Sequence, residues 1–259
     1  MSLKTRTPLT DKPLRNPGQS VEEKLSELAY DRVLTPSLIA VFLLVLAAME
    51  WWRQYSGMRP SPMLFSAIAS LTAAYAVFRV VKTLPELKML RLARDGERVV
   101  GQFLERLRER GYQVFHDVVG EGFNVDHVLI GPSGVFTVET KTRSKPARGE
   151  SKIHFDGQTV RVAGFEPDRD PVVQAKAQVA WLRELLVEST GQKFPVRPII
   201  LFPGWFVEQI KGSTRDLWVL NPKALPDFID HEPKILSESE IKLASFHLSR
   251  FIRSNTALA

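Results

Sequence analysis

Two long runs without charged side chains constrain the fold of this chain more than any other feature. They extend over residues 33–49 and 62–81, and the only charge in either is Arg79, near the end of the second run. As a helix rising about 1.5 Å per residue, the second run would span roughly 30 Å, the thickness of a bilayer's hydrocarbon core. Tryptophans follow the first run, as they do at membrane interfaces. The sequence therefore predicts a two-helix transmembrane hairpin at residues 33–82, with the lipid bilayer as a partner.

Two other interpretations of the apolar runs stay open. A cleaved signal peptide is disfavoured because the first run begins late and the second follows it at once. A buried helical hairpin of a soluble protein remains an alternative, since the first run is short and contains Pro36. Arg53 and Arg59 are the only basic residues between the runs, whereas several basic residues flank the pair of runs on the outside. Both termini are therefore predicted to be cytoplasmic.

Small side chains on the second run form a surface that could pack against the first helix. The same surface could instead pack against another copy of the chain and give a homo-oligomer. Equally, it could be the ordinary composition of a membrane helix. The residues concerned are Ser66, Ala69, Ser70, Ala73 and Ala74.

Outside the hairpin, composition divides the chain into four further parts. Residues 1–32 are expected to form a polar, mostly disordered arm with room for a short amphipathic helix, and residues 83–94 a juxtamembrane linker helix. Residues 95–220 mix apolar and charged side chains as a water-soluble domain does, and residues 221–259 are expected to form a C-terminal helical extension.

Charge and cysteine content narrow the function classes. The chain has no cysteine, which excludes disulfides and zinc sites built on thiolates but leaves oxygen-ligated metals open. A net charge of +6 and a pI near 9.6 suit a polyanionic partner, either nucleic acid or an anionic membrane surface.

Hydrophobic periodicity and turn residues predict the elements of the soluble part. The last helix would open with a capping box made by Ser237 and Glu240. Helices are expected at about 95–110, 172–189 and 237–253, and strands at 112–119, 124–130, 135–142, 152–155, 158–163, 197–202 and 217–220.

Asp126, Glu139 and Lys141 share one face of a predicted hairpin, in which a Gly-Pro-Ser-Gly turn joins two alternating strands. If Ile130 pairs with Val135, Asp126 falls directly opposite Glu139, and Lys141 lies two residues further along the same face. Opposed Cβ atoms lie about 4.5–5.5 Å apart, so two carboxylates could share one cation. A nearby lysine could then position the attacking water and stabilise charge on a phosphate.

The same three residues could instead be the polar face of a half-solvated hairpin, which alternation alone would permit. Two opposed carboxylates repel each other without a cation, however, and a divalent metal would turn that repulsion into a site. His127 alternates to the face opposite Asp126 and is expected to be a packed or capping residue.

The motifs of this hairpin and of the helix before it resemble those of a known family. An acid on one strand and Glu-x-Lys on the next match the PD-(D/E)xK nuclease superfamily, and the string GERVVGQFLERL … NVDHVLIGPSGVFTVETK is similar to its NERD branch, the nuclease-related domain. The resemblance covers about Asp95 to Gly204. It implies an α/β, restriction-endonuclease-like fold with an αβββαβ core, here preceded by the transmembrane hairpin.

The resemblance also implies the chemistry and the residues that carry it. Asp126 and Glu139 would hold Mg²⁺ or Mn²⁺, with Lys141 beside the water that attacks the phosphodiester. A glutamate from the first helix is matched by Glu97, whose alternative role is that of a helix N-terminal charge favoured by the macrodipole. Gln174 matches a glutamine that would orient the lysine or bind phosphate, or else it is merely a polar residue of a first helical turn.

A basic segment follows the Glu-x-Lys motif. It could hold a nucleic-acid backbone through charge, in a salt-sensitive and sequence-independent way. Alternatively, it is a solvated loop near an anionic membrane. The four residues are Arg143, Lys145, Arg148 and Lys152.

Together these features predict a membrane-anchored, divalent-metal-dependent nuclease acting on nucleic acid, with DNA favoured over RNA. The alternative is a catalytically inactive scaffold that uses the same fold to hold nucleic acid or a partner at the membrane. A third interpretation is a soluble protein whose apolar hairpin mediates oligomerisation.

Overall fold

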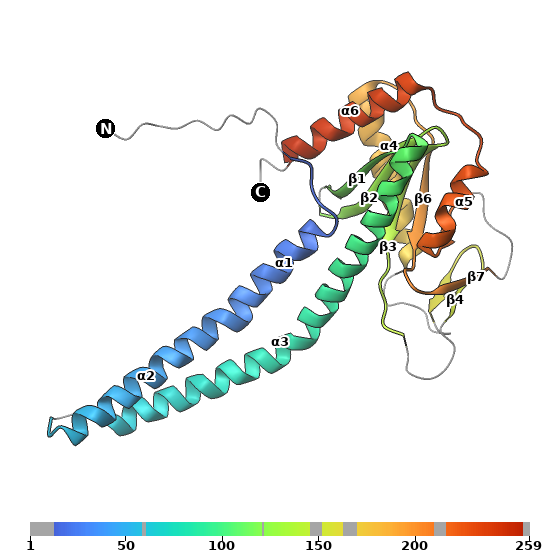
Figure 1. The fold of residues 1–259 in the computed structure, drawn as a ribbon. Coiled ribbons are helices and arrows are strands. Elements are labelled where there is room, and N and C mark those ends of the chain that lie inside the picture. The colour runs from blue at the N-terminus through green and yellow to red at the C-terminus, as the bar shows by residue number, and fades with distance from the viewer. Residues whose placement is uncertain are drawn as a thin grey trace, which may run out of the picture. The chain divides into compact units, whose positions relative to one another are not determined.

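The computed structural model describes residues 13–58, 61–120, 122–145, 152–162, 170–209 and 216–255. The chain divides into two compact units (Figure 1). One unit is helical and covers Ser20–Leu92, whereas the other combines Met1–Gln19 with Ala93–Ala259 and contains all of the strands.

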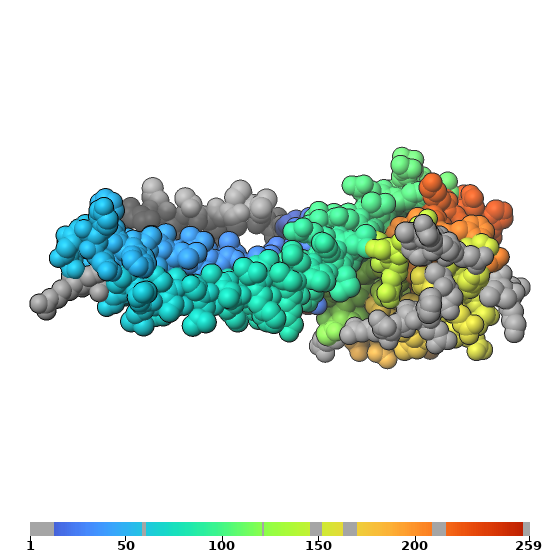
Figure 2. All heavy atoms as spheres, turned by 90° about the horizontal axis from the view of Figure 1, so that it is seen from below, coloured from blue at the N-terminus to red at the C-terminus, as the bar shows by residue number. Residues whose placement is uncertain are grey.

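The helical unit is a pair of long antiparallel helices. Helix α1 (Gln19–Ala29) passes through a π-helical turn, η1 (Tyr30–Leu34), into α2 (Thr35–Tyr55). Helix α3 (Pro62–Leu104) returns beside α2 (Figures 1 and 2). The polar arm expected over residues 1–32 is therefore helical from Gln19 onward.

Small residues face inward in the helical unit and large ones face outward. Ala40 and Ala47 on α2 are buried, as are Ala69 and Ala76 on α3, with a spacing of seven residues in both helices. The indole Nε1 of Trp51 donates a hydrogen bond to Ser66 Oγ at 2.9 Å. The large side chains that point away from this contact are exposed, among them Leu38, Phe42, Leu71 and Phe78.

This packing separates the five small residues predicted to share one surface. Ala69 is buried, and Ser66 and Ala73 are half-buried on the side that meets α2. Ser70 and Ala74 are exposed on the other side. Small size therefore serves the contact between the two helices at only three of the five positions.

Helix α3 is longer than the sequence predicts. The expected transmembrane, linker and domain helices form one helix that continues through Pro85 to Leu104. A 3₁₀ segment, η2 (Glu105–Arg110), follows and ends at Gly111, whose φ of 84° lies in the left-handed region that glycine tolerates.

The second unit is built on a mixed five-stranded sheet in the order β1-β2-β3-β6-β8. Strands β1 to β3 are antiparallel, whereas β3, β6 and β8 run parallel. A smaller sheet has the order β5-β4-β7. The bounds are β1 Gln113–Val119, β2 Asn124–Gly131, β3 Gly134–Thr140, β4 Lys152–Phe155, β5 Val160–Val162, β6 Val196–Leu201, β7 Phe206–Gln209 and β8 Trp218–Leu220.

Helices cover both faces of the five-stranded sheet. On one face, α4 (Pro171–Thr190) and α6 (Glu238–Asn255) pack through side chains such as Leu182 and Leu248. On the other face, the end of α3 packs with α5 (Leu225–Asp230), which follows the 3₁₀ turn η3 (Pro222–Ala224). Strand β3 is buried throughout, and its alternation directs Glu139 toward the α4 face.

The mixed α/β architecture predicted from the sequence is confirmed. Along the chain, α3 precedes β1, β2 and β3, and α4 and β6 follow them. The β4–β5 hairpin is inserted before α4. The sequence did not predict β7, η3 or α5.

Candidate active site

The register of the β2–β3 hairpin brings two carboxylates together at one end of the sheet. Ile130 pairs with Val135 as expected, and the pairing continues to His127 and Val138. Beyond that point the backbone N–H of Thr140 donates to Asp126 Oδ2 at 2.7 Å. The carboxylate of Asp126 therefore occupies the place where the strand pairing ends.

Three of the predicted residues form a closed set of hydrogen bonds. The Lys141 ammonium donates to Glu139 Oε1 at 2.7 Å and to Gln174 Oε1 at 2.8 Å. The amide nitrogen of Gln174 also donates to Glu139 Oε1, at 2.7 Å. Gln174 lies in the first turn of α4, which Asp170 caps by accepting the N–H of Val172. Its amide fixes the lysine and the carboxylate relative to each other.

Gln178 is a fourth member of this set that sequence reasoning missed. Its amide nitrogen donates to Glu139 Oε2 at 2.5 Å and to the carbonyl oxygen of Asn124 at 3.1 Å. The side chain is only 1% exposed. Because Gln178 lies four residues after Gln174, the two share one face of α4, and that spacing was a signal available in the sequence.

Glu97 reaches the same region because its neighbour has no side chain. A Cβ on Gly96 would lie 1.7 Å from the hydroxyl oxygen of Thr142, just after β3. Glycine thus lets α3 approach the end of β3 closely, and Glu97 on the next position is 7% exposed.

The carboxylates of this region disfavour one another's ionised forms. Burial, followed by the charges of Asp117 and Glu139, raises the pKa of Glu97 to about 8, although Lys141 opposes the shift. Burial raises the pKa of Asp126 well above its usual range, and the charges of Glu139 and Glu97 raise it further. Lys141 therefore does not compensate the charge that these acids would carry if all of them were ionised.

Asp117 is a buried acid that no sequence pattern pointed to. Continuing the β1–β2 register from His116↔His127 places it opposite Asp126, although the observed pairing passes over this position. Its φ of 49° is left-handed, and its carboxylate accepts a 2.6 Å hydrogen bond from Arg15 Nε. Arg15 belongs to the segment before α1, so residues 102 positions apart form this buried ion pair.

The segment before α1 also touches Glu97 directly. The backbone N–H of Gly18 donates to the Glu97 carboxylate, which partly offsets the rise of its pKa. A Cβ on Gly101 would lie 2.5 Å from Pro17, so a second glycine of α3 allows this approach. Residues 15–18 therefore belong to the surroundings of the acids, rather than to a free arm.

His127 faces away from this set, as expected. Its side chain is fully buried, and its Nδ1 lies 2.9 Å from the Nδ1 of His116 on β1.

Three of the four basic residues predicted to bind nucleic acid lie within the described residues. Arg143 and Lys145 are exposed, and the Arg143 carbonyl accepts the indole N–H of Trp205 at 3.1 Å. Lys152 begins β4, with its ammonium 3.8 Å from the Glu208 carboxylate. Arg148 lies outside the described residues.

No group of three or more histidine, aspartate or glutamate side chains within the described ranges is arranged to hold a metal ion. Both oxygens of Glu139 accept hydrogen bonds, one from Lys141 and Gln174 and the other from Gln178. A carboxylate offers about four lone-pair positions, however, so one remains on Glu139. Oxygen Oδ1 of Asp126 accepts no hydrogen bond from the part of the chain that the structure describes.

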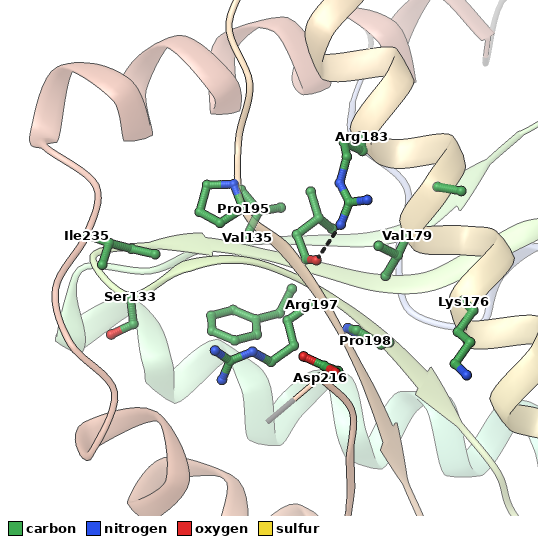
Figure 3. A pocket seen from close by; sticks show the side chains of 13 residues that line it. Ser133, Val135, Lys176, Val179, Arg183, Pro195, Arg197, Pro198, Asp216 and Ile235 are labelled. Carbon is green, nitrogen blue, oxygen red and sulfur yellow. Dashed lines mark hydrogen bonds between the residues drawn. The ribbon is translucent and has the colours of Figure 1, made fainter. Parts of the chain in front are cut away.

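A separate hollow of about 540 Å³ lies near the opposite ends of β3 and β6 (Figure 3). Lys176 and Arg183 of α4 and Arg197 of β6 line it. Arg183 donates to the carbonyl of Val196 at 3.2 Å, and Arg197 is paired with Glu232 at 2.9 Å. None of the residues predicted to be catalytic lines this hollow.

The mixed sheet thus carries buried acids at one end, and a lysine and two glutamines surround Glu139. The family model of the nuclease-related domain, NERD, matches residues 92–203, which include Glu97, Asp126, Glu139, Lys141 and Gln174. Residues 92–203 are therefore similar to the nuclease-related domain, as the sequence resemblance predicted.

Among curated proteins, no sequence matches this chain. A solved structure, that of SfsA from Pyrococcus furiosus in complex with Ca²⁺, matches with 18% sequence identity and a TM-score of 0.23. The match covers 58% of this chain and 53% of the other, so it spans about half of that protein's length. A TM-score this low carries no argument about fold or function.

Proposed function

We propose that this protein is a divalent-metal-dependent nuclease held at a membrane, which hydrolyses phosphodiester bonds of nucleic acid with Asp126, Glu139 and Lys141. The observation that carries the proposal is the hydrogen-bonded set in which Lys141 and Gln174 share one oxygen of the buried Glu139. An acid, a Glu-x-Lys motif and a glutamine on the following helix also suit a restriction-endonuclease-like αβββαβ core.

The donor set fits Mg²⁺ or Mn²⁺. Asp126 Oδ1 and the remaining position on Glu139 would hold the ion, and Glu97 would be the third ligand, all through oxygen atoms. The raised pKa values of Asp126 and Glu97 support this assignment, because a divalent cation would compensate the charge that disfavours their ionised forms. When bound, the ion would polarise the phosphate and make a coordinated water more acidic.

The chain's own residues supply orientation and charge. An ammonium has three donors, and Lys141 uses two of them on Glu139 and Gln174. The third can reach a phosphate oxygen or the attacking water. Gln174 donates to one oxygen of the Glu139 carboxylate and Gln178 donates to the other. The carboxylate therefore does not need to reorganise during the reaction.

Membrane anchoring rests on the helical unit. Gln19–Tyr55 and Pro62–Arg110 are helical stretches long and apolar enough to cross a membrane, and only 11% of the apolar window of each is buried. The core helix of a soluble protein would bury most of that surface. Both termini would lie in the cytoplasm. A protein that leaves the membrane pellet during carbonate extraction would contradict this part of the proposal.

A cleavage assay tests the chemistry. Full-length protein in detergent is incubated with labelled single- and double-stranded DNA and RNA, with Mg²⁺, Mn²⁺ or EDTA. Cleavage is expected only with a divalent ion and is expected to fall about a thousandfold in Lys141→Ala. Lys176→Ala is the control. Lys176 is exposed on the same face of the sheet but lines the hollow of Figure 3. Equal cleavage by all three proteins would refute the proposed site.

A catalytically inactive scaffold is the second candidate, favoured by the engaged oxygens of Glu139 and by the lack of a preformed three-ligand group within the described ranges. The same assay separates the two candidates. A scaffold would bind nucleic acid with no cleavage under any metal condition.

A further inference from the structure

A second hollow, of about 750 Å³, lies where β6 and β8 end, and none of the residues proposed for catalysis lines it. Phe206 and Phe228 supply aromatic walls, and Lys145 and Lys223 supply positive charge. None of the described residues that line it is acidic. Aromatic faces together with two cations and no carboxylate suit a flat ring that carries phosphates on either side.

Phe206 is the aromatic side chain of this hollow that a ligand can contact. It is 63% exposed at the start of β7, whereas the neighbouring Trp205 is only 1% exposed. Phe228 is partly buried by its edge-to-face contact with Trp218, with ring centroids 5.5 Å apart. The Phe206 ring is therefore available for stacking, while Trp205 and Phe228 form the fixed boundary behind it.

The walls of this hollow are held by hydrogen bonds that a ligand would not have to organise. Asn221 donates from Nδ2 to the carbonyl of Trp205 at 2.7 Å and accepts the backbone N–H of Lys223 at 3.0 Å. The Trp205 indole donates to the carbonyl of Arg143. A preorganised wall of this kind reduces the entropy lost on binding.

The hollow lies close to the proposed catalytic residues, because only a few residues of chain separate Lys141 from Lys145. Lys141 is bonded to Glu139, Arg143 is bonded to Trp205, and the Lys145 ammonium lies 5.8 Å from the centroid of the Trp205 ring. Four residues of extended chain reach at most about 14 Å, so the hollow lies within a few nucleotides of Lys141. The hollow of Figure 3 lies at the other end of the sheet, away from Lys141. Its arginines already bind other groups of the protein, namely the Val196 carbonyl and Glu232.

We propose that the hollow formed by Phe206, Phe228, Lys145 and Lys223 binds an unpaired nucleobase of a single-stranded nucleic acid. The base stacks on Phe206, and its flanking phosphates lie on the two lysines. This inference rests on the proposed function and deepens it by naming the substrate class. A base within a duplex is stacked on both faces and paired along one edge. Its face therefore cannot reach Phe206 unless the strand opens.

Fluorescence anisotropy tests the subsite with the full-length protein in detergent and EDTA, so that no cleavage occurs. The probes are a labelled single strand of roughly ten nucleotides, its blunt duplex, and single strands with one abasic position. Phe206→Ala is expected to raise the Kd for the single strand about tenfold and to leave the duplex Kd unchanged. Phe206→Tyr keeps an aromatic ring and should restore binding. Phe246→Ala is the matched control, because Phe246 is similarly exposed on α6.

The abasic probes identify the stacked base. At one position, removing the base should weaken binding to wild-type protein about tenfold but have no further effect on Phe206→Ala, since both changes remove the same contact. Lys145→Ala should lower the salt dependence of binding by about one phosphate contact. An unchanged single-strand Kd in Phe206→Ala, or equal losses for single strand and duplex, would overturn the subsite.

The outcomes for subsite and nuclease can be told apart. Cleavage by wild-type protein with an unchanged Phe206→Ala Kd would refute the subsite and leave the nuclease intact. Single-strand binding that depends on Phe206, without cleavage under any metal condition, would refute the nuclease and keep the subsite.

Discussion

The two units of this protein place their side chains in opposite ways. In the helical unit, alanines such as Ala69 fill the contact between helices, and large apolar residues such as Phe42 point outward. In the α/β unit, large apolar residues fill the interior, and four acids are brought close to one another at one end of the sheet. The first unit exposes large apolar side chains, whereas the second tolerates electrostatic repulsion at a specific place. Such tolerance is typical of sites that do chemistry.

The largest effect should follow from removing one of these charges without changing its shape. Asp126→Asn is expected to lower cleavage about a thousandfold and, because burial and the charges of Glu139 and Glu97 disfavour the ionised carboxylate of Asp126, to raise the melting temperature. Cleavage kinetics and thermal unfolding measure the two effects. A variant that loses both activity and stability would mean that Asp126 is a structural residue.

The pH dependence of stability should be the second largest effect and should come from Glu97 together with Asp126, whose pKa values are both raised. Since the folded protein raises the pKa of Glu97 from 4.5 to about 8, it binds this proton more tightly than the unfolded chain does. The stabilising contribution is thus complete below about pH 4.5 and is lost as the pH rises toward 8. The free energy of unfolding is expected to fall by roughly 3 kcal/mol between pH 5 and 7.5.

Chemical unfolding without divalent ions, at several pH values, measures this slope. Glu97→Gln should flatten it, whereas Glu184→Gln, at an exposed position on α4, should not. Added Mg²⁺ should also flatten it if Glu97 is a ligand. A slope that is unchanged in Glu97→Gln would show that Glu97 does not contribute to the pH dependence, whereas a reduced slope is the share expected from Asp126.

A smaller loss is expected where α3 meets the end of β3. Gly96→Ala places a methyl group on the Thr142 side chain and should destabilise the α/β unit by about 2 kcal/mol, with a loss of cleavage as Glu97 moves away. Combining it with Thr142→Gly removes the atoms that clash and should restore part of both properties. If the double variant is no better than Gly96→Ala, the close approach is not the reason for the glycine.

The smallest effect should come from the helical unit. Ala69→Leu forces a larger side chain between α2 and α3 and is expected to lower stability in nanodiscs by about 1 kcal/mol, whereas Leu71→Ala, at a residue 73% exposed, should change it little. Thermal unfolding in nanodiscs provides the measurement. The reverse order would mean that Leu71 lies in a contact, for example with a second copy of the chain.

The sequence predicted what local geometry determines. A short turn determines the register of the β2–β3 hairpin, so the neighbourhood of Asp126 and Glu139 followed from counting residues across it. Gln178 was within reach of the same reasoning, since it lies one helical turn after Gln174. The family resemblance, rather than periodicity, supplied Glu97 and Gln174.

Non-local contacts were beyond sequence reasoning. Arg15 and Asp117 meet only because the segment before α1 packs against β1, and nothing in the residues near either one indicates the other. Strand β7 is four residues long and pairs in parallel with β4, which lies about fifty residues earlier in the chain. Short strands with distant partners leave no periodic signal of their own.

The α/β unit is discontinuous in sequence, because Met1–Gln19 and Ala93–Ala259 belong together while Ser20–Leu92 form the other unit. A ribosome adding about 5–20 residues per second would therefore make Arg15 several seconds before any part of β1 exists. During that interval helices α1 to α3 are made, before the strands of the α/β unit exist. A fragment that begins after the helices would lack Arg15 and leave the buried Asp117 without its ion pair. Biogenesis and the choice of fragments for biochemistry are thus tied to a short segment that precedes the first helix.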